Sequence, residues 1–414
     1  MKNILFKYFF AMAVIFSCSE DTASIEQLPN QSPEAFNLLS LTEGALTSNL
    51  LPTFTWEEAV DPEGEQVTYS IVMGKSVNTM VPVASGITDT NFTLNERLEF
   101  SEDFFWTVIA KDQLGAEQQA NTIFTFSTRP INNGILAETT LRALHDHTTL
   151  VFQDKLWIIG GRDANSGRVL NSADGINWNL VTSNAAFLKK SNHSAVVFKD
   201  KMWVIGGENG NSSNTNDVWS SSDGIIWEQA TRNAAFLPRQ GQSSVVFDNK
   251  MWVIGGHVNF TSQSINDVWF SEDGVNWSPA TNNANFQILQ NHTTVVFNNK
   301  MYNISGNLVR FSTDGRFWQI VSEIPTFGAT RQHHASVVFD NKLWAIGGLN
   351  AADQRDVWFS KDGIRWTLNT NRANFNERSK HTAITFNDKL WVIGGVRVFS
   401  NSGQDPNNGT WFLN

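Results

Sequence analysis

Cysteine is almost absent from this chain, since Cys18 is the one cysteine among 414 residues. No disulfide can form within the chain, and no thiolate is available for chemistry in the body of the protein. Tyrosine is also scarce, with three residues beside 16 tryptophans and 30 phenylalanines. Charged residues make up 17%, below the usual level of about 25%. The apolar run Phe9–Phe16 is too short for a membrane-spanning helix, which needs about 20 apolar residues.

Positive charge is also in short supply, because the formal net charge is −10. Residues 19–130 hold 17 acidic and 4 basic side chains, whereas residues 131–414 hold 23 acidic and 24 basic ones. The two parts therefore differ in composition, which indicates separate domains. A basic stripe that could follow a phosphate backbone is lacking, so we expect no nucleic-acid partner.

The first 17 residues have the pattern of a bacterial secretion signal. Lys2 and Lys7 precede the apolar run, which ends in Ile15-Phe16-Ser17-Cys18. This ending resembles a lipobox, with an aliphatic residue three before the cysteine and a small residue directly before it. The resemblance implies cleavage before Cys18 and lipidation of its thiol. The alternative is an ordinary signal peptide followed by an incidental cysteine.

The residues after Cys18 indicate where such a lipoprotein would be placed. Ser19-Glu20-Asp21 resembles the surface-export signal of Bacteroidetes lipoproteins. Residues 18–32 are predicted to be the lipidated cysteine and a polar, proline-punctuated tether. We therefore expect a protein of the bacterial cell envelope, anchored to the outer membrane through the lipid on Cys18 and exposed at the surface.

Residues 33–129 read as a β-sandwich module. Short alternating segments, such as Pro52–Trp56 and Phe104–Lys111, are separated by turn signals at Asp61–Gly64 and Asp112–Gly115. The tryptophan at 56 and the pattern W-x-V-x-A-x-D-x-x-G from Trp106 resemble fibronectin type III modules. The resemblance implies a spacer that holds the next domain away from the membrane.

Residues 130–414 contain six copies of one hairpin. Each copy has a first strand that ends in Phe, a short polar step with a lysine, and a second strand that ends in a glycine pair. The pairs are Gly160-Gly161, Gly206-Gly207, Gly255-Gly256, Ser305-Gly306, Gly347-Gly348 and Gly394-Gly395. A variable loop, a third strand and an Asp-Gly-x-x-Trp turn into a fourth strand then follow in most copies.

Four strands per copy, a period near 47 residues and paired glycines resemble kelch repeats, the units of a β-propeller. The expected fold is therefore all-β, a six-bladed kelch-type β-propeller preceded by a β-sandwich module. The sixth copy ends at its third strand, and the segment Ile135–Leu141 precedes the first copy. We infer that this N-terminal segment completes the last blade and closes the ring, which removes the free sheet edges.

One position in each copy places a polar side chain at the start of the innermost strand. These candidate channel-mouth residues are His147, His193, Gln242, His292, His334 and His381. They allow two interpretations: a ligand funnel or metal ring, or a repeated side chain that bonds to the neighbouring blade. Because a six-bladed channel is wide for a shared metal, we predict no metal site and no cofactor.

Three residues before these positions lie Arg239, Arg331 and Arg378, with Lys190 in a fourth copy. Arginines at one channel rim could clamp a carboxylate, as sialidases do. The alternative is that they make contacts between blades, as in many kelch repeats.

The residue inventory narrows the function. The copper radical site of galactose oxidase needs tyrosines and a cysteine, but this domain has only Tyr302 and no cysteine. We expect a binding module for a glycan or protein partner at the loop face of the propeller. The alternative is a glycan-active enzyme of the sialic-acid mutarotase or sialidase type, acting through the arginine rim.

Overall fold

The computed structural model describes residues 29–137, 141, 144–162, 167–258, 263–285, 291–306, 308–321, 331–350, 352–397 and 409–414. The predicted signal peptide and Cys18 lie outside these residues. The chain forms two compact units. The first contains residues up to 47, 51–96 and 103–127, and the second contains residues 48–50, 97–102 and 128–414. In the described part of the chain, no helix has the length and apolar character needed to cross a membrane.

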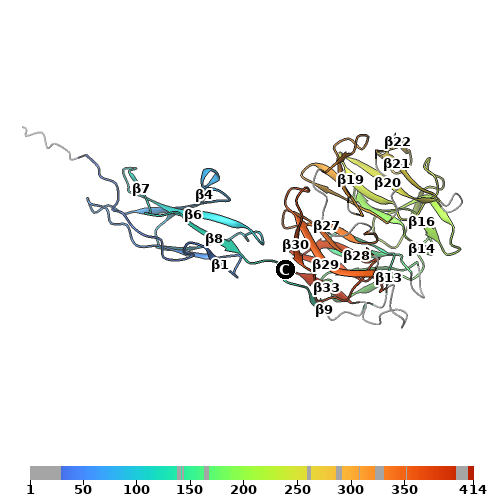
Figure 1. Ribbon diagram of the computed structural model, residues 1–414, viewed down its shortest axis with the longest axis horizontal. Helices are drawn as coiled ribbons and strands as arrows, with labels where there is room; N and C mark the ends of the chain where they lie inside the picture. The colour runs from blue at the N-terminus through green and yellow to red at the C-terminus, as the bar shows by residue number, and fades with distance from the viewer. Residues whose placement is uncertain are drawn as a thin grey trace, which may run out of the picture. The chain divides into compact units, whose positions relative to one another are not determined.

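The first unit is built from two β-sheets (Figure 1). Its strands are β1 (Ala45–Thr47), β2 (Thr53–Thr55), β3 (Thr68–Gly74), β4 (Val81–Ile87), β5 (Asn91–Thr93), β6 (Asp103–Lys111), β7 (Glu117–Gln119) and β8 (Phe124–Thr128). One sheet has the order β1-β8-β6-β3-β4, with β7 paired to β6, and the other pairs β2 with β5. Trp56 and Trp106 are both buried, and the Trp106 ring packs 4.7 Å from that of Phe54. The fibronectin type III assignment stays a prediction.

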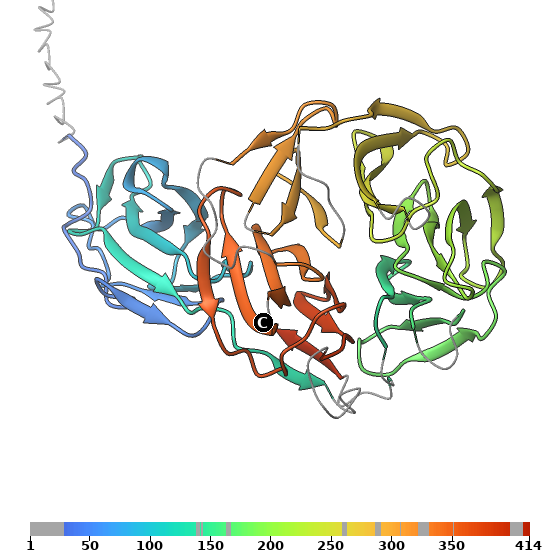
Figure 2. The same cartoon turned by 45° about the vertical axis from the view of Figure 1, so that its right-hand side comes forward.

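The second unit contains six sheets that follow one another around a ring (Figure 2). We call them blades one to six, in chain order. Blade one contains β10 (Thr148–Phe152), β11 (Lys155–Ile159), β12 (Val169–Ser172) and β13 (Asn179–Thr182). Blade two contains β14 (Lys190–Ser191), β15 (Ser194–Phe198), β16 (Lys201–Asn209), β17 (Asn214–Ser221) and β18 (Glu228–Thr231). Blade three contains β19 (Ser243–Phe247), β20 (Lys250–Val258), β21 (Gln263–Ser271) and β22 (Ser278–Thr281).

Blades four to six complete the ring. Blade four contains β23 (Thr293–Phe297), β24 (Lys300–Ser305), β25 (Leu308–Ser312) and β26 (Gln319–Ile320). Blade five contains β27 (Ala335–Phe339), β28 (Lys342–Asn350), β29 (Ala352–Ser360) and β30 (Thr367–Thr370). Blade six contains β31 (Thr382–Phe386), β32 (Lys389–Ile393), β33 (Thr410–Leu413) and β9 (Ile135–Ala137). The first strands β10, β15, β19, β23, β27 and β31 contact one another in that order, and β31 contacts β10. The predicted six-bladed β-propeller is therefore confirmed.

Ring closure occurs in blade six, where β33 from the C-terminus pairs antiparallel with β9 (Figure 1). Thr410 lies opposite Ala137, and Phe412 lies opposite Ile135. The inference that an N-terminal strand completes the last blade is thus confirmed for residues 135–137. Pairing β33 with a strand from the other end of the repeat region leaves no incomplete blade.

Two kinds of turn explain why the same residues recur. Each polar step of the inner hairpin has two residues with positive φ, such as Asp340 (52°) and Asn341 (52°), as a two-residue type I′ turn requires. In the Asp-Gly-x-x-Trp turn of blade two, Asp223 Oδ1 accepts the backbone N–H of Ile225 and Ile226 at 2.8 and 2.9 Å. A Cβ on Gly224 would lie 2.2 Å from the Trp157 ring, so this turn packs against the preceding blade.

Candidate functional site

A closed ring of backbone hydrogen bonds surrounds the propeller axis on one face. Its members are the residues just before the six channel-mouth positions: Asp146, Asn192, Gly241, Asn291, His333 and Lys380. Each backbone N–H donates to the carbonyl of the member in the preceding blade at 2.9–3.2 Å, and Asp146 closes the ring by donating to Lys380. All six have positive φ, between 49° and 62°. Asn, Asp and Gly tolerate this conformation best, which accounts for four of the six residue choices.

The six predicted channel-mouth side chains are buried between the blades, with 3–6% of their surface exposed. In four blades the histidine Nε2 forms a hydrogen bond with a hydroxyl of the preceding blade. His193, for example, lies 2.9 Å from Thr148 Oγ1. Gln242 uses its amide in the same way and donates to Ser194 Oγ and to the Ile205 carbonyl. These contacts follow the interpretation in which a repeated side chain bonds to its neighbour.

His381, the fifth histidine of the set, differs because its neighbour has no hydroxyl. In the other five contacts, the hydroxyl belongs to the residue directly after the channel-mouth position of the preceding blade. These residues are Thr148, Ser194, Ser243, Thr293 and Thr382. For His381 the equivalent residue is Ala335. Neither imidazole nitrogen of His381 has a hydrogen-bond partner among the described residues.

The five histidines and Gln242 at the channel-mouth positions, which we call the histidine ring, also explain the glycine pairs. A Cβ on Gly160 would lie 2.8 Å from Cε1 of His193 in the next blade. A Cβ on Gly161 would lie 2.8 Å from Cβ of His147 in its own blade. The first glycine therefore makes room for the neighbouring imidazole and the second for the imidazole of its own blade. The two recurring motifs are halves of one contact between blades.

Burial keeps these imidazoles neutral. It lowers the pKa of His147, His193, His292 and His334 to about 3, from an ordinary value near 6.5. Burial also lowers the pKa of His381 well below its usual value. No group of three or more histidine, cysteine or acidic residues placed to hold a metal ion occurs within the described ranges.

The axial cavity between the two rings is small, at about 120 Å³, and is lined by their twelve residues. Its charged side is formed around Asp146, whose Oδ2 lies 2.9 Å from His145 Nδ1 and 3.3 Å from Lys380 Nζ. Its other residues are amides, a glycine and neutral imidazoles. A volume of this size suits water or a very small polar molecule. The three predicted arginines are not among its lining residues.

The structure places the arginines inside their own blades, with at most 2% of their surface exposed. Arg239 forms two hydrogen bonds with Asp267, at 2.6 and 2.9 Å, and donates to the Gly255 carbonyl. Arg331 pairs with Asp356 in the same way. The carboxylate that these two guanidinium groups hold is therefore one from their own domain.

Arg378 and Lys190 occupy the same position with different partners. Arg378 donates to the Gly394 carbonyl and lies 3.8 Å from the centroid of the Trp411 ring. Lys190 Nζ donates to Asp217 Oδ1 at 2.7 Å, to Thr215 Oγ1 and to the Gly206 carbonyl. The common element is a cation that binds the carbonyl of the first glycine of the pair.

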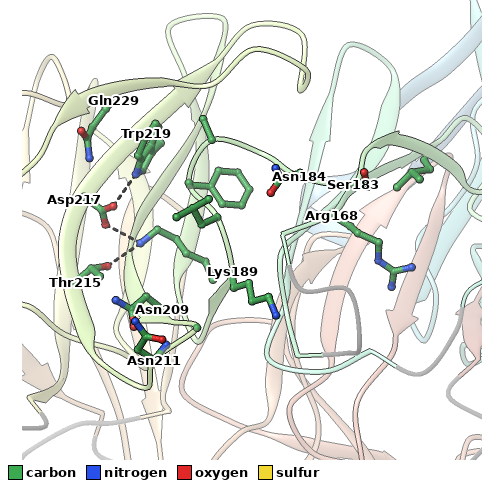
Figure 3. Close-up of a pocket in the computed structure, with 16 residues that line it drawn as sticks. Arg168, Ser183, Asn184, Lys189, Asn209, Asn211, Thr215, Asp217, Trp219 and Gln229 are labelled. Carbon is green, nitrogen blue, oxygen red and sulfur yellow. Dashed lines mark hydrogen bonds and ion pairs between the residues drawn. The ribbon is translucent and has the colours of Figure 1, made fainter.

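A groove of about 900 Å³ lies between blades one and two (Figure 3). Trp219, Asp217 and Thr215 of β17 line one side, and Arg168 lies on the other. The groove is also lined by parts of the β13–β14 connection and the β16–β17 turn, which supply Ser183, Asn184, Ala186, Phe187, Leu188, Lys189, Asn209, Gly210 and Asn211. Its volume lies in the range of pockets that take small ligands, about 300–1,000 Å³.

Two adjacent lysines have opposite roles in this groove. Lys190 is buried and bonded to three partners, whereas Lys189 is exposed and forms no hydrogen bond or ion pair with any described residue. The stem of Lys189 lies against Gly210, where a Cβ would meet its Cδ at 3.1 Å. The stem of Lys189 therefore packs beside the Gly210 backbone, in a side chain that stays exposed.

Sequence reasoning did not identify this groove. Its signal is a difference between copies: Lys189 stands where the next copy has Pro238, in otherwise similar segments NAAFLKK and NAAFLPR. Asn209 and Asn211 belong to the variable loop that follows the glycine pair of blade two. A comparison of what differs between the repeats would have pointed to these residues.

Comparison with known proteins agrees with the repeat analysis. Residues 146–348 match the model of the KLHDC2/KLHL20/DRC7 Kelch-repeats domain. No curated protein sequence matches the chain. The matched residues run from the first member of the backbone ring, in blade one, to the second glycine of the pair in blade five. Together with the six-sheet ring, the glycine pairs and the closure by β9, this match identifies the repeat region as a kelch-type β-propeller.

Proposed function

We propose that this protein is a bacterial surface lipoprotein whose kelch-type propeller binds a glycan. The observation that carries the binding role is the groove between blades one and two. It has the volume of a small-ligand site, and its polar side chains include the exposed amides of Asn184, Asn211 and Gln229, which form no hydrogen bond to another blade among the described residues. A protein partner is the alternative ligand at the same face.

The groove is favoured over the axial ring because the repeated polar residues are already engaged. The imidazoles bond to neighbouring blades, and Arg239 and Arg331 each hold an aspartate. The enzymatic alternative depended on an arginine rim that would clamp a substrate carboxylate. We therefore propose a binding role rather than an enzymatic one.

The anchor rests on the lipobox-like ending at Cys18. We expect the wild-type protein to fractionate with membranes and to be accessible to protease on intact cells. A Cys18→Ala variant should appear in the soluble fraction, because the lipid cannot be attached. Retention of that variant in the membrane, or a soluble wild-type protein, would refute the anchor.

The binding role is tested with the mature chain, residues 18–414, carrying Cys18→Ser to prevent lipidation. We expect it to bind a subset of probes on a glycan array. A Lys189→Gln, Asn211→Ala double variant should lose that binding while keeping its circular dichroism spectrum. Absence of any glycan ligand, together with capture of a defined protein partner, would replace the glycan with the alternative.

A further inference from the structure

We propose that the groove between blades one and two selects glycans that carry a carboxylate on a sugar ring, with Lys189 as the anchoring cation. This inference rests on the proposed function, because it specifies the ligand class of the same groove.

Charge is the first argument. The described lining residues include three cations, Arg168, Lys189 and Lys190, and one carboxylate, Asp217. Both oxygens of Asp217 are occupied, Oδ1 by Lys190 Nζ and Oδ2 by Trp219 Nε1, each at 2.7 Å. The formal charge of the described lining is therefore positive, in a repeat region whose acidic and basic side chains nearly balance. A negative ligand is attracted to this groove.

The second argument is the uncommitted ammonium group. Lys190 is neutralised by Asp217, whereas Lys189 Nζ has no partner among the described residues. Gly210 supports the Lys189 stem, so fewer rotamers are open to this side chain than to a lysine that projects into water. A supported cation loses less side-chain entropy when it binds an anion. Its salt link to a ligand carboxylate is a charge-assisted hydrogen bond, which is stronger than a neutral one.

The third argument is the mixture of amides and apolar surface, which suits a sugar better than a peptide. Asn184, Asn211 and Gln229 line the groove and are exposed. Their amides can both donate to and accept from ring hydroxyls. Leu188 and Leu180, 63% and 57% exposed, together with part of Trp219, offer apolar surface for the C–H face of a sugar ring.

Modes of peptide recognition differ in how well they fit this groove. Strand addition needs an open sheet edge, which the outer strands β13 and β18 beside the groove offer, whereas a helix needs a continuous apolar floor. Here the polar residues of the β13–β14 connection and of the β16–β17 turn stand between the apolar ones. An acidic peptide is therefore the competing ligand that the experiment must exclude.

The experiment is isothermal titration calorimetry of the mature Cys18→Ser chain with four probes. These are trigalacturonate, the same trisaccharide with its carboxyl groups reduced to alcohols, 3′-sialyllactose and hexaglutamate. Trigalacturonate and its reduced form differ only at the carboxylates. The sialoside distinguishes the two sources of a sugar carboxylate.

We expect trigalacturonate or the sialoside to bind at least about ten-fold more tightly than the reduced sugar. Lys189→Gln should remove most of that difference. Lys155→Gln is the matched control, because it removes an exposed lysine at the opposite end of blade one and should leave the affinity unchanged. Raising the salt concentration from 50 to 500 mM should lower the affinity for the acidic probe and leave the affinity for the neutral one unchanged.

Three outcomes would overturn the inference, and they separate it from the proposed function. Equal affinity for the reduced and acidic sugars would remove the carboxylate preference and leave a glycan-binding groove. Tighter binding of hexaglutamate than of either acidic sugar would assign the groove to acidic peptides. No heat with any probe, while a neutral glycan binds on an array, would reject the acidic ligand class and leave the glycan-binding role.

Discussion

A single hydroxyl separates five contacts of the histidine ring from the sixth. Four imidazoles and one glutamine reach a serine or threonine in the preceding blade, whereas His381 faces Ala335. Both nitrogens of this buried imidazole lack a partner among the described residues. A buried polar group without a partner costs about 1–3 kcal/mol.

We therefore predict that Ala335→Ser stabilises the propeller. The new hydroxyl supplies the missing partner, and the free energy of unfolding should rise by about 0.5–1.5 kcal/mol in urea denaturation followed by tryptophan fluorescence. Thr293→Ala is the reciprocal control, since it removes the hydroxyl 2.9 Å from His334 Nε2 and should destabilise the protein. Loss of stability on Ala335→Ser would show that this site has no room for the hydroxyl.

The neutral imidazoles predict loss of stability at mildly acidic pH. Their pKa is about 3 in the folded protein and about 6.5 when unfolded, so the unfolded chain binds protons first. The stability they contribute is present above pH ~6.5 and is lost as the pH falls from there towards 3. The loss is at most about 1.4 kcal/mol per pH unit for each imidazole.

His193→Gln tests this origin, because Gln242 shows that the ring accepts glutamine. The variant should fold. Between pH 7 and pH 5 its free energy of unfolding should change less steeply with pH than that of the wild type, and the difference in slope should correspond to about one bound proton. The measurement is urea denaturation across this pH range. An unchanged pH dependence would mean that other groups cause the acid sensitivity.

At the scale of the element, the cation–aspartate pair fastens the third strand of a blade to the glycine pair. In blade three, Arg239 joins the Gly255 carbonyl of β20 to Asp267 of β21, and Asp267 accepts from Trp269 Nε1 at 2.7 Å. The same arrangement occurs in blade five with Arg331 and Asp356. The residues predicted as a ligand clamp therefore hold two strands of one blade together.

Removal of the carboxylate should expose the cost of burying Arg239. Asp267→Asn leaves a guanidinium group with no exposed surface and no counter-charge, and we expect a loss of about 3–5 kcal/mol in denaturant unfolding. Glu228→Gln removes one partner of an exposed pair with Lys201 and should change stability by less than about 1 kcal/mol. Equal effects of the two substitutions would contradict the assigned role.

Several strands and turns of the propeller could be predicted from the sequence. The inner hairpins and the Asp-Gly-x-x-Trp turns were predictable because local residue chemistry determines them. The closing strand was predictable because the sixth copy ends at its third strand. The hydrogen bond between each channel-mouth histidine and a hydroxyl of the preceding blade could also have been predicted, because Ser or Thr follows the channel-mouth residue in five copies. The differences between copies mark residues of the groove, such as Lys189, but the groove itself could not be predicted, because it depends on how Lys189 and Gly210 meet in space.

At the scale of the whole molecule, repetition and function fall on different residues. The backbone ring, the histidines and the glycine pairs occur in every or nearly every blade, and they join each blade to the next. The groove occurs where blades one and two carry side chains that differ from the repeat. In the proposed surface lipoprotein, the lipid on Cys18 would hold this propeller at the membrane while the groove takes its ligand.

Hydrogen–deuterium exchange of the mature chain, with and without trigalacturonate, tests the location of the ligand site most directly. We expect slower exchange in residues 183–191 and 209–215, which border the groove, and no change in residues 145–148 and 291–293 at the axis. Lys189→Gln should abolish the effect. Protection confined to the axial residues, or the same protection in the Lys189→Gln variant, would contradict the account.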